Sequence, residues 1–165
     1  MRHLKRHRTI VVVVSALVWW TAAPGAFRQG GRPEPVSRVT EYQAGEACAF
    51  PVRIEASGRE KVIPLPGDRL NIASPQLRVT FTNLDDPSQQ HTQMITGPIR
   101  VRFLDNGDAA LVFTGINFLE AFTPELPYLA LVVGHLELTL DVDGNFVAGP
   151  AGPARIVDAC GLISD

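Results

Sequence analysis

Beyond its first 25 residues the chain has two histidines, His91 and His135, and two cysteines, Cys48 and Cys160. A serine hydrolase needs a histidine between its nucleophile and a carboxylate, and the sequence contains no Gly-x-Ser-x-Gly turn to carry that nucleophile. No pair of these four residues has the spacing of zinc ligands. His135 lies on the outward side of an alternating segment and His91 lies in a polar stretch. We therefore expect both histidines at the surface and predict no metal ion, cofactor or catalytic residue.

Acidic residues offer two further kinds of chemistry. The carboxylate pairs Asp85–Asp86 and Glu120–Glu125 could serve a glycosidase, but that reaction needs two carboxylates across a cleft, and exposed carboxylates are the ordinary interpretation. The segment 141–145 (DVDGN) places oxygen ligands at alternate positions, as a calcium loop does. No acidic residue follows in 146–153 to complete such a loop. We interpret the segment as a hairpin turn. Because none of these acidic residues points to a specific reaction, an extracellular enzyme is the least favoured function.

The first 25 residues have the order of segments found in a secretory signal peptide. A basic stretch, Met1–Arg8, is followed by the apolar stretch Ile10–Trp20 and then by small residues. The apolar stretch is shorter than the roughly 20 residues that a membrane-spanning helix needs. We expect residues 1–25 to be a cleaved signal peptide, with an uncleaved anchor as the alternative. The mature protein is then secreted or associated with the cell envelope, without stable membrane insertion.

Removal of that segment makes the protein acidic. It takes away four of the 15 Lys and Arg residues and none of the 17 Asp and Glu residues, leaving 11 against 17 and a net charge of about −6. Nucleic acids and anionic membranes need clustered cations, so neither is expected as a partner. Export also favours a disulfide between Cys48 and Cys160, the only two cysteines.

Alternation of apolar and polar residues dominates the rest of the chain and predicts half-buried strands. The dipeptides Asn106-Gly107 and Asp143-Gly144 lie between such segments and favour tight hairpin turns. The sequence therefore predicts one all-β domain over 47–165, a single antiparallel β-sandwich or barrel of about eight to ten short strands. The clearest alternating positions are Phe50, Val52 and Ile54; Leu77, Val79 and Phe81; Ile99, Val101 and Phe103; and Leu136, Leu138 and Leu140.

Two segments depart from this alternation. Residues 26–46 are polar, with Gly, Pro and mixed charges, and we expect a flexible N-terminal arm there. Residues 116–129 concentrate Phe118, Phe122 and Tyr128 in a connection too long for a tight hairpin. This connection could be a lid over a cavity, an apolar contact loop, or a plug that closes one end of the core, and we favour the plug.

A series of turn residues punctuates residues 48–160. They are Leu65-Pro66-Gly67, Ser74-Pro75, Thr82-Asn83, Thr96-Gly97-Pro98, Asn106-Gly107-Asp108, Thr114-Gly115, Asp143-Gly144-Asn145 and Asp158-Ala159-Cys160. This pattern resembles that of a family of short exported β-domain proteins of high-GC Gram-positive bacteria, a family without assigned function. The resemblance implies no catalytic residue.

These observations favour a secreted, non-enzymatic domain with a binding or interaction role, whose partner would be a protein or a small apolar ligand. The alternative is a carrier of a small apolar ligand with a lid at 116–129. A roomy internal cavity would favour the carrier, and a polar cleft with a histidine beside a carboxylate would favour the enzyme.

Overall fold

The computed structural model describes residues 31–120, 123 and 125–164, and these residues are almost entirely β. The expected all-β antiparallel domain is therefore confirmed, whereas the expected signal peptide lies outside the described residues. Within these ranges no helix is long and apolar enough to cross a bilayer. The strands are β1 (Glu34–Tyr42), β2 (Val52–Leu65), β3 (Arg69–Ala73), β4 (Leu77–Asn83), β5 (Gln90–Ile95), β6 (Ile99–Phe103), β7 (Ala109–Glu120), β8 (Leu129–Leu140), β9 (Phe146–Ala151) and β10 (Arg155–Asp158), followed by the 3₁₀ turn η2 (Cys160–Leu162).

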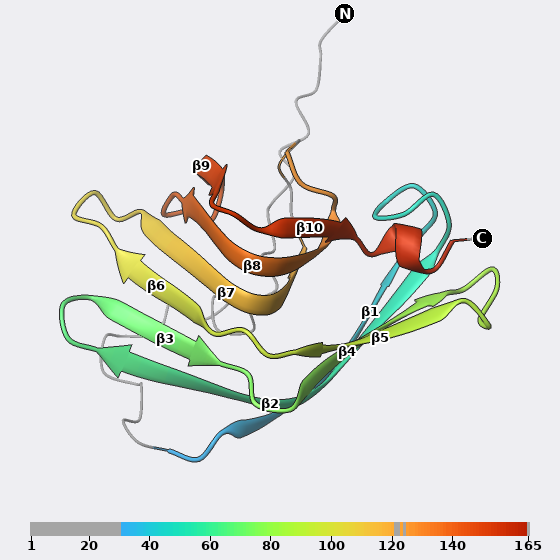
Figure 1. Cartoon of the computed structure of the whole chain (residues 1–165), viewed down its shortest axis with the longest axis horizontal. Helices are drawn as coiled ribbons and strands as arrows, with labels where there is room; N and C mark the ends of the chain where they lie inside the picture. The colour runs from blue at the N-terminus through green and yellow to red at the C-terminus, as the bar shows by residue number, and fades with distance from the viewer. Residues whose placement is uncertain (1–30, 121–122, 124, 165) are drawn as a thin grey trace, which may run out of the picture.

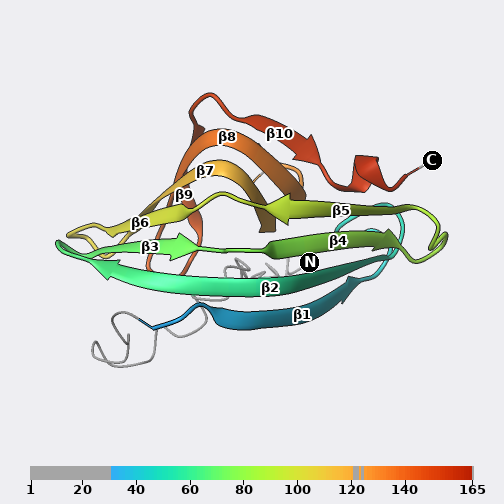
Figure 2. The same cartoon turned by 60° about the horizontal axis from the view of Figure 1, so that its bottom comes forward.

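The ten strands form one antiparallel sheet that is not closed into a barrel, in the order β10-β8-β7-β6-β3-β2-β4-β5, with β1 also paired to β2 and β9 to β8. Short strands share long neighbours: β3 and β4 pair with the second and first halves of β2, and β9 and β10 pair with the second and first halves of β8. Strands β7, β8 and β10 lie above β1, β2, β4 and β5, while β3 and β6 connect these two layers (Figure 1). The same layering is visible after the 60° turn (Figure 2), and it makes the fold sandwich-like.

Two glycines mark the place where the layers separate. The ladder between β6 and β7 ends near the Ile99–Phe113 pair, beyond which the backbone nitrogens of Thr96 and Gly97 both donate to the Ile116 carbonyl oxygen, at 3.1 and 2.9 Å. A Cβ on Gly97 would lie 2.0 Å from the Thr114 carbonyl oxygen, and Gly115 has a φ of 76°. Only glycine fits so close a backbone approach and adopts that φ freely. From this point β7 leaves β5 and crosses over the lower layer.

Two apolar clusters form the core. One lies between the layers and joins Val52 and Ile54 of β2 and Phe81 of β4 to Leu129 and Leu131 of β8. The other covers one face of the β6–β7–β8 region. Both include alternating residues that the sequence singles out, such as Val52 and Val79 in the first and Val101 and Leu138 in the second, because each strand turns its apolar side inward. The second cluster contains Ile72, Ile99, Val101, Ala109, Leu111, Phe113, Leu119, Leu126, Ala130, Val132, Leu136, Leu138 and Leu140.

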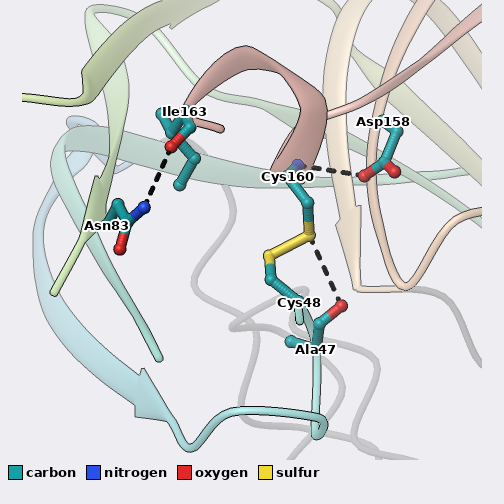
Figure 3. Close-up of a disulfide and its surroundings, with 6 residues drawn as sticks. All are labelled: Ala47, Cys48, Asn83, Asp158, Cys160 and Ile163. Carbon is teal, nitrogen blue, oxygen red and sulfur yellow. Dashed lines mark hydrogen bonds between the residues drawn. A yellow bond between two sulfur atoms is a disulfide. The ribbon is translucent and has the colours of Figure 1, made fainter. Parts of the chain in front are cut away.

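The expected disulfide is confirmed. Cys48 precedes β2 and Cys160 opens η2, with their Cα atoms 5.6 Å apart (Figure 3). The Asn83 side-chain amide donates to the Ile163 carbonyl oxygen at 3.3 Å, and the Cys160 backbone nitrogen donates to the Asp158 carboxylate at 2.9 Å. The strands next to the two cysteines, β2 and β10, do not pair with each other. The disulfide therefore ties the two layers together rather than joining neighbouring strands.

The flexible arm expected over 26–46 is wrong over 34–42, because Glu34–Tyr42 is strand β1, while residues 26–30 lie outside the described residues. This strand pairs with β2 continuously from Glu34↔Glu60 to Tyr42↔Val52. Its inward positions include Arg38, Thr40 and Tyr42, so it shows no apolar period. Backbone hydrogen bonds to the edge of β2 hold it in place, and Tyr42 at its end packs against the apolar cluster between the layers.

The long connection expected over 116–129 is also wrong. Residues up to Glu120 belong to β7 and Leu129 begins β8, and the two strands pair without interruption from Ala109↔Leu140 to Glu120↔Leu129. Gly115 and Gly134 face each other in this ladder and obscured its alternation in the sequence. The connection is confined to residues 121–128.

Candidate ligand groove

A concave groove of about 920 Å³ lies on the sheet across β2, β3, β6, β7, β8 and β9. Five strand spacings of about 4.8 Å separate β2 from β9, so the groove is elongated, about 24 Å across the strands. Its volume falls within the range of about 300–1,000 Å³ that is typical of ligand sites. The described residues that line it are Ile63, Leu65, Arg69, Leu70, Asn71, Arg100, Val101, Arg102, Ala110, Leu111, Val112, Glu137, Leu138, Thr139, Ala148, Gly149 and Ala151.

The strand alternation explains which side chains reach this groove. In β6, Ile99 and Val101 are buried on the core face, so the exposed Arg100 and Arg102 stand on the opposite face. The same rule turns Ala110 and Val112 of β7 into the groove, because Leu111 and Phe113 are in the core.

Strand register places three arginines together. Arg69 of β3 lies directly opposite Arg102 of β6, and Arg100 is two residues away on the same face. Like charges directly opposite each other destabilise a sheet. Arg69 donates from its Nε to the Pro66 carbonyl oxygen at 2.8 Å. None of the three has a carboxylate within 4 Å among the described residues, unlike Arg53, whose Nε lies 2.8 Å from Glu41. The groove thus carries uncompensated positive charge.

The arginines have apolar neighbours on both sides. Ile63 and Leu65 of β2 flank them in one direction, and Leu65 is 39 % exposed. Ala110 and Val112 of β7 flank them in the other direction. Among the described residues that line the groove, Glu137 is the only one with a carboxylate, and its Oε1 lies 2.7 Å from His135 Nε2. The surface therefore combines a basic centre with apolar flanks.

A second polar group lies between the layers. The Tyr42 hydroxyl donates to Glu120 Oε2 at 2.8 Å, and the Tyr42 ring meets the Tyr128 ring edge-on at 5.4 Å between centroids. Glu120 is only 4 % exposed, and burial raises its pKa above the ordinary value of 4.5, against the opposing effects of the Tyr42 hydrogen bond and the Arg38 charge. Burial, followed by the Glu120 contact, likewise raises the pKa of Tyr42.

A cavity of about 60 Å³ adjoins Glu120, and its other lining residues include Arg38, Glu60, Asn117 and Phe118. Burial raises the pKa of the Glu60 carboxyl as well. The volume has room for a few water molecules, and it is several times smaller than a typical ligand pocket. This cavity therefore offers much less space than the outer groove.

The buried carboxyl predicts a measurable pH effect. Because the pKa of Glu120 is raised in the folded state, the folded protein binds more protons than the unfolded chain once the pH exceeds 4.5, and stability falls as pH rises. Glutamine still accepts the Tyr42 hydrogen bond but does not ionise. The free energy of unfolding of Glu120→Gln relative to that of the native protein should therefore rise from pH 4 to pH 8, as urea unfolding at the two pH values would measure. Glu60 is present in both proteins, so its contribution to the pH dependence cancels in the comparison. An equal stability difference between the two proteins at pH 4 and at pH 8 would contradict the raised pKa of Glu120.

The structure separates the residues that the sequence singled out. Phe118 lies in β7 and packs edge-on against Phe81, with 5.1 Å between ring centroids. Tyr128 contacts Tyr42, whereas Phe122 lies outside the described residues. His91 in β5 and His135 in β8 are both half-buried rather than fully exposed as expected, and His135 lies beside Glu137.

The acidic motifs also have structural explanations. Asp141 accepts hydrogen bonds from the Asn145 side-chain amide and from the backbone nitrogens of Asn145 and Asp143, and these bonds lower its pKa. The segment is a hairpin turn. Glu120 is buried and not exposed as expected, whereas Glu125 is exposed and bonds to Thr123. Among the described residues, no group of three or more His, Cys, Asp or Glu side chains could hold a metal ion.

Sequence reasoning missed the arginine cluster. The alternation of Arg100 and Arg102 already placed both on one outward face. Arg69 joins them only through the pairing of β3 with β6, strands that are separated in the chain by β4 and β5. Comparison of the chain with family models, curated proteins and solved structures finds no match.

Proposed function

We propose that this chain is exported, loses residues 1–25, and acts outside the cytoplasm as a binding domain whose ligand lies in the groove across β2 to β9. The observation that carries the proposal is the groove itself, about 920 Å³ and lined by apolar side chains from β2, β7 and β9 as well as by three arginines. Apolar surface gathered in a concavity is typical of binding sites. Cys48–Cys160 supports an extracytoplasmic location, because disulfides persist in oxidising compartments.

The carrier with an internal site receives less support. The cavity between the layers has a volume of about 60 Å³, and Phe118, expected in its lid, is part of a core strand. A ligand of ordinary size fits the groove without any rearrangement of the sandwich. A neutral apolar dye, N-phenyl-1-naphthylamine, is a suitable probe because its fluorescence rises in apolar surroundings.

We expect the mature domain to bind this dye and Ala110→Trp to abolish the binding, because the indole would fill the centre of the groove. Ser57→Trp, at an exposed position on β2 away from the groove, is the matched control and should bind like the native protein. Fluorescence titration provides the dissociation constants, and thermal unfolding shows whether both variants are folded. No dye binding by the native domain, or equal binding by both variants, would overturn the proposal.

Export has its own test. Mass spectrometry of culture supernatant from a secreting bacterial host should find a mature N-terminus between about residues 23 and 30, because the small residues after the apolar stretch match a cleavage site. Recovery of full-length protein only, in the membrane pellet, would refute export with cleavage.

A further inference from the structure

We propose that Arg69, Arg100 and Arg102 bind a tetrahedral oxyanion, so that the groove takes an anionic amphiphile with a phosphate-type or sulfonate headgroup. This inference rests on the proposed function, because it assigns the chemistry of a ligand in the same groove. It starts from the register that places Arg69 opposite Arg102, with Arg100 two residues along β6.

Geometry favours an anion at this point. Residues opposite each other in an antiparallel pair have Cα atoms about 4.5–5.5 Å apart, and residues two apart in a strand are about 7 Å apart. Three long, exposed guanidinium groups from these positions can converge on one small group. An anion between them removes the repulsion across the β3–β6 pair, which no described carboxylate does.

The number of donors favours a tetrahedral group. A guanidinium presents a planar fork of N–H donors that matches phosphate and carboxylate oxygens in pairs. A carboxylate has two oxygens, whereas a phosphate monoester or sulfonate has three free oxygens and can accept bonds from three guanidinium groups at once. Three arginines around one point therefore suit a tetrahedral oxyanion better than a carboxylate.

The surroundings favour an amphiphile over a free inorganic ion. Ile63 and Leu65 lie on one side of the arginines, and Ala110 and Val112 lie on the other. A headgroup held by the arginines leaves an apolar chain free to lie over either flank. The ligand is then a molecule with one apolar body and one anionic end, such as an alkyl phosphate.

Two dyes with the same aromatic body test the inference. 8-Anilino-1-naphthalenesulfonate carries a sulfonate that N-phenyl-1-naphthylamine lacks. We expect the native domain to bind the sulfonate dye at least about tenfold more tightly, because hydrogen bonds to charged groups are among the strong ones. The double variant Arg100→Gln/Arg102→Gln should lose this preference, so that it binds the two dyes with similar affinity.

The control is Arg78→Gln/Arg155→Gln, which removes the same charge from exposed positions on β4 and β10 outside the groove. This variant should keep the preference for the sulfonate dye. Equal affinity of the native domain for both dyes, or equal loss of preference in both double variants, would overturn the oxyanion site and leave the groove standing. Binding of neither dye would instead overturn the proposed function.

Competition against the neutral dye distinguishes a phosphate from a carboxylate headgroup, and an amphiphile from free inorganic phosphate. Octyl phosphate should displace it at concentrations at least about tenfold lower than octanoate, since a carboxylate has one oxygen fewer. Inorganic phosphate should displace it poorly, because it lacks the apolar body. Equal potency of octanoate would refute the tetrahedral preference, and equal potency of inorganic phosphate would refute the amphiphile.

Discussion

Replacement of Cys48 and Cys160 together by serine is expected to lower the free energy of unfolding by about 2–5 kcal/mol, the usual cost of losing a native disulfide in a small secreted domain. The two residues are separated by 112 positions, so the disulfide closes most of the domain into one loop. In the chain-entropy model, closing a loop of that length lowers the conformational entropy of the unfolded chain by an amount worth about 4.8 kcal/mol. Urea unfolding of both proteins measures the loss.

Reduction of the native protein provides the control. Dithiothreitol should lower the urea midpoint of the native protein to that of the double serine variant and should leave the variant unchanged. The disulfide also ties the two layers, since Cys160 follows β10 and Cys48 precedes β2. A native midpoint unaffected by complete reduction would contradict both the stabilisation and the structural role of this link.

Phe81→Ala is expected to cost about 3–5 kcal/mol, as truncation of a buried phenylalanine does when the transfer and cavity contributions add. The side chain of Phe81 is fully buried between the layers and meets Phe118 edge-on. Phe118→Ala should also destabilise the domain, but less, because Phe118 is half-buried. Val142→Ala, at a position 59 % exposed in a turn, should change stability by no more than about 0.5 kcal/mol.

The two phenylalanines should also be coupled. A double-mutant cycle of Phe81→Ala and Phe118→Ala isolates the ring contact, for which aromatic pairs give about 0.5–1.5 kcal/mol. Additive effects of the two changes would show that the rings do not pack together. A urea midpoint unchanged by Phe118→Ala would show that this residue does not help to join the layers and would make a role in binding the better explanation.

Local patterns predicted the strands well where one side of a strand is buried. The segments around Val52, Val79, Val101 and Leu138 alternate with period two, because each has one face in the core. The Asn106-Gly107 and Asp143-Gly144 hairpins follow from turn chemistry, which is also local.

The wrong expectations have a common physical cause. Strand β1 is held by backbone pairing to β2, and backbone hydrogen bonds leave no apolar pattern in the sequence. The second half of β7 follows Gly115, whose conformation bends the strand and hides its continuation. Glu120 is buried because Tyr42, 78 positions away, supplies its hydrogen bond. Partners so distant in the chain cannot be read from local spacing.

The groove could not be predicted from local spacing either. The outward positions of Arg100 and Arg102 were visible in the alternation of β6, but a groove needs the curvature of several strands and the register that joins them. Arg69 reaches the cluster because β3 and β4 together run alongside β6 and β5. Sequence reasoning therefore found the face of each strand and missed the surface that the strands build together.

The most direct test of the groove as the binding site is a ¹H–¹⁵N NMR titration of the mature domain with 8-anilino-1-naphthalenesulfonate. A ligand in the groove should shift the amide signals of Arg69–Ala73, Ile99–Phe103 and Ala109–Phe113, the segments of β3, β6 and β7 that form it. Amides of β1 and β5, outside the groove, should stay unchanged. Shifts concentrated in β1 and β5, or no shifts at all at saturating dye, would contradict the assignment of the groove as the binding site.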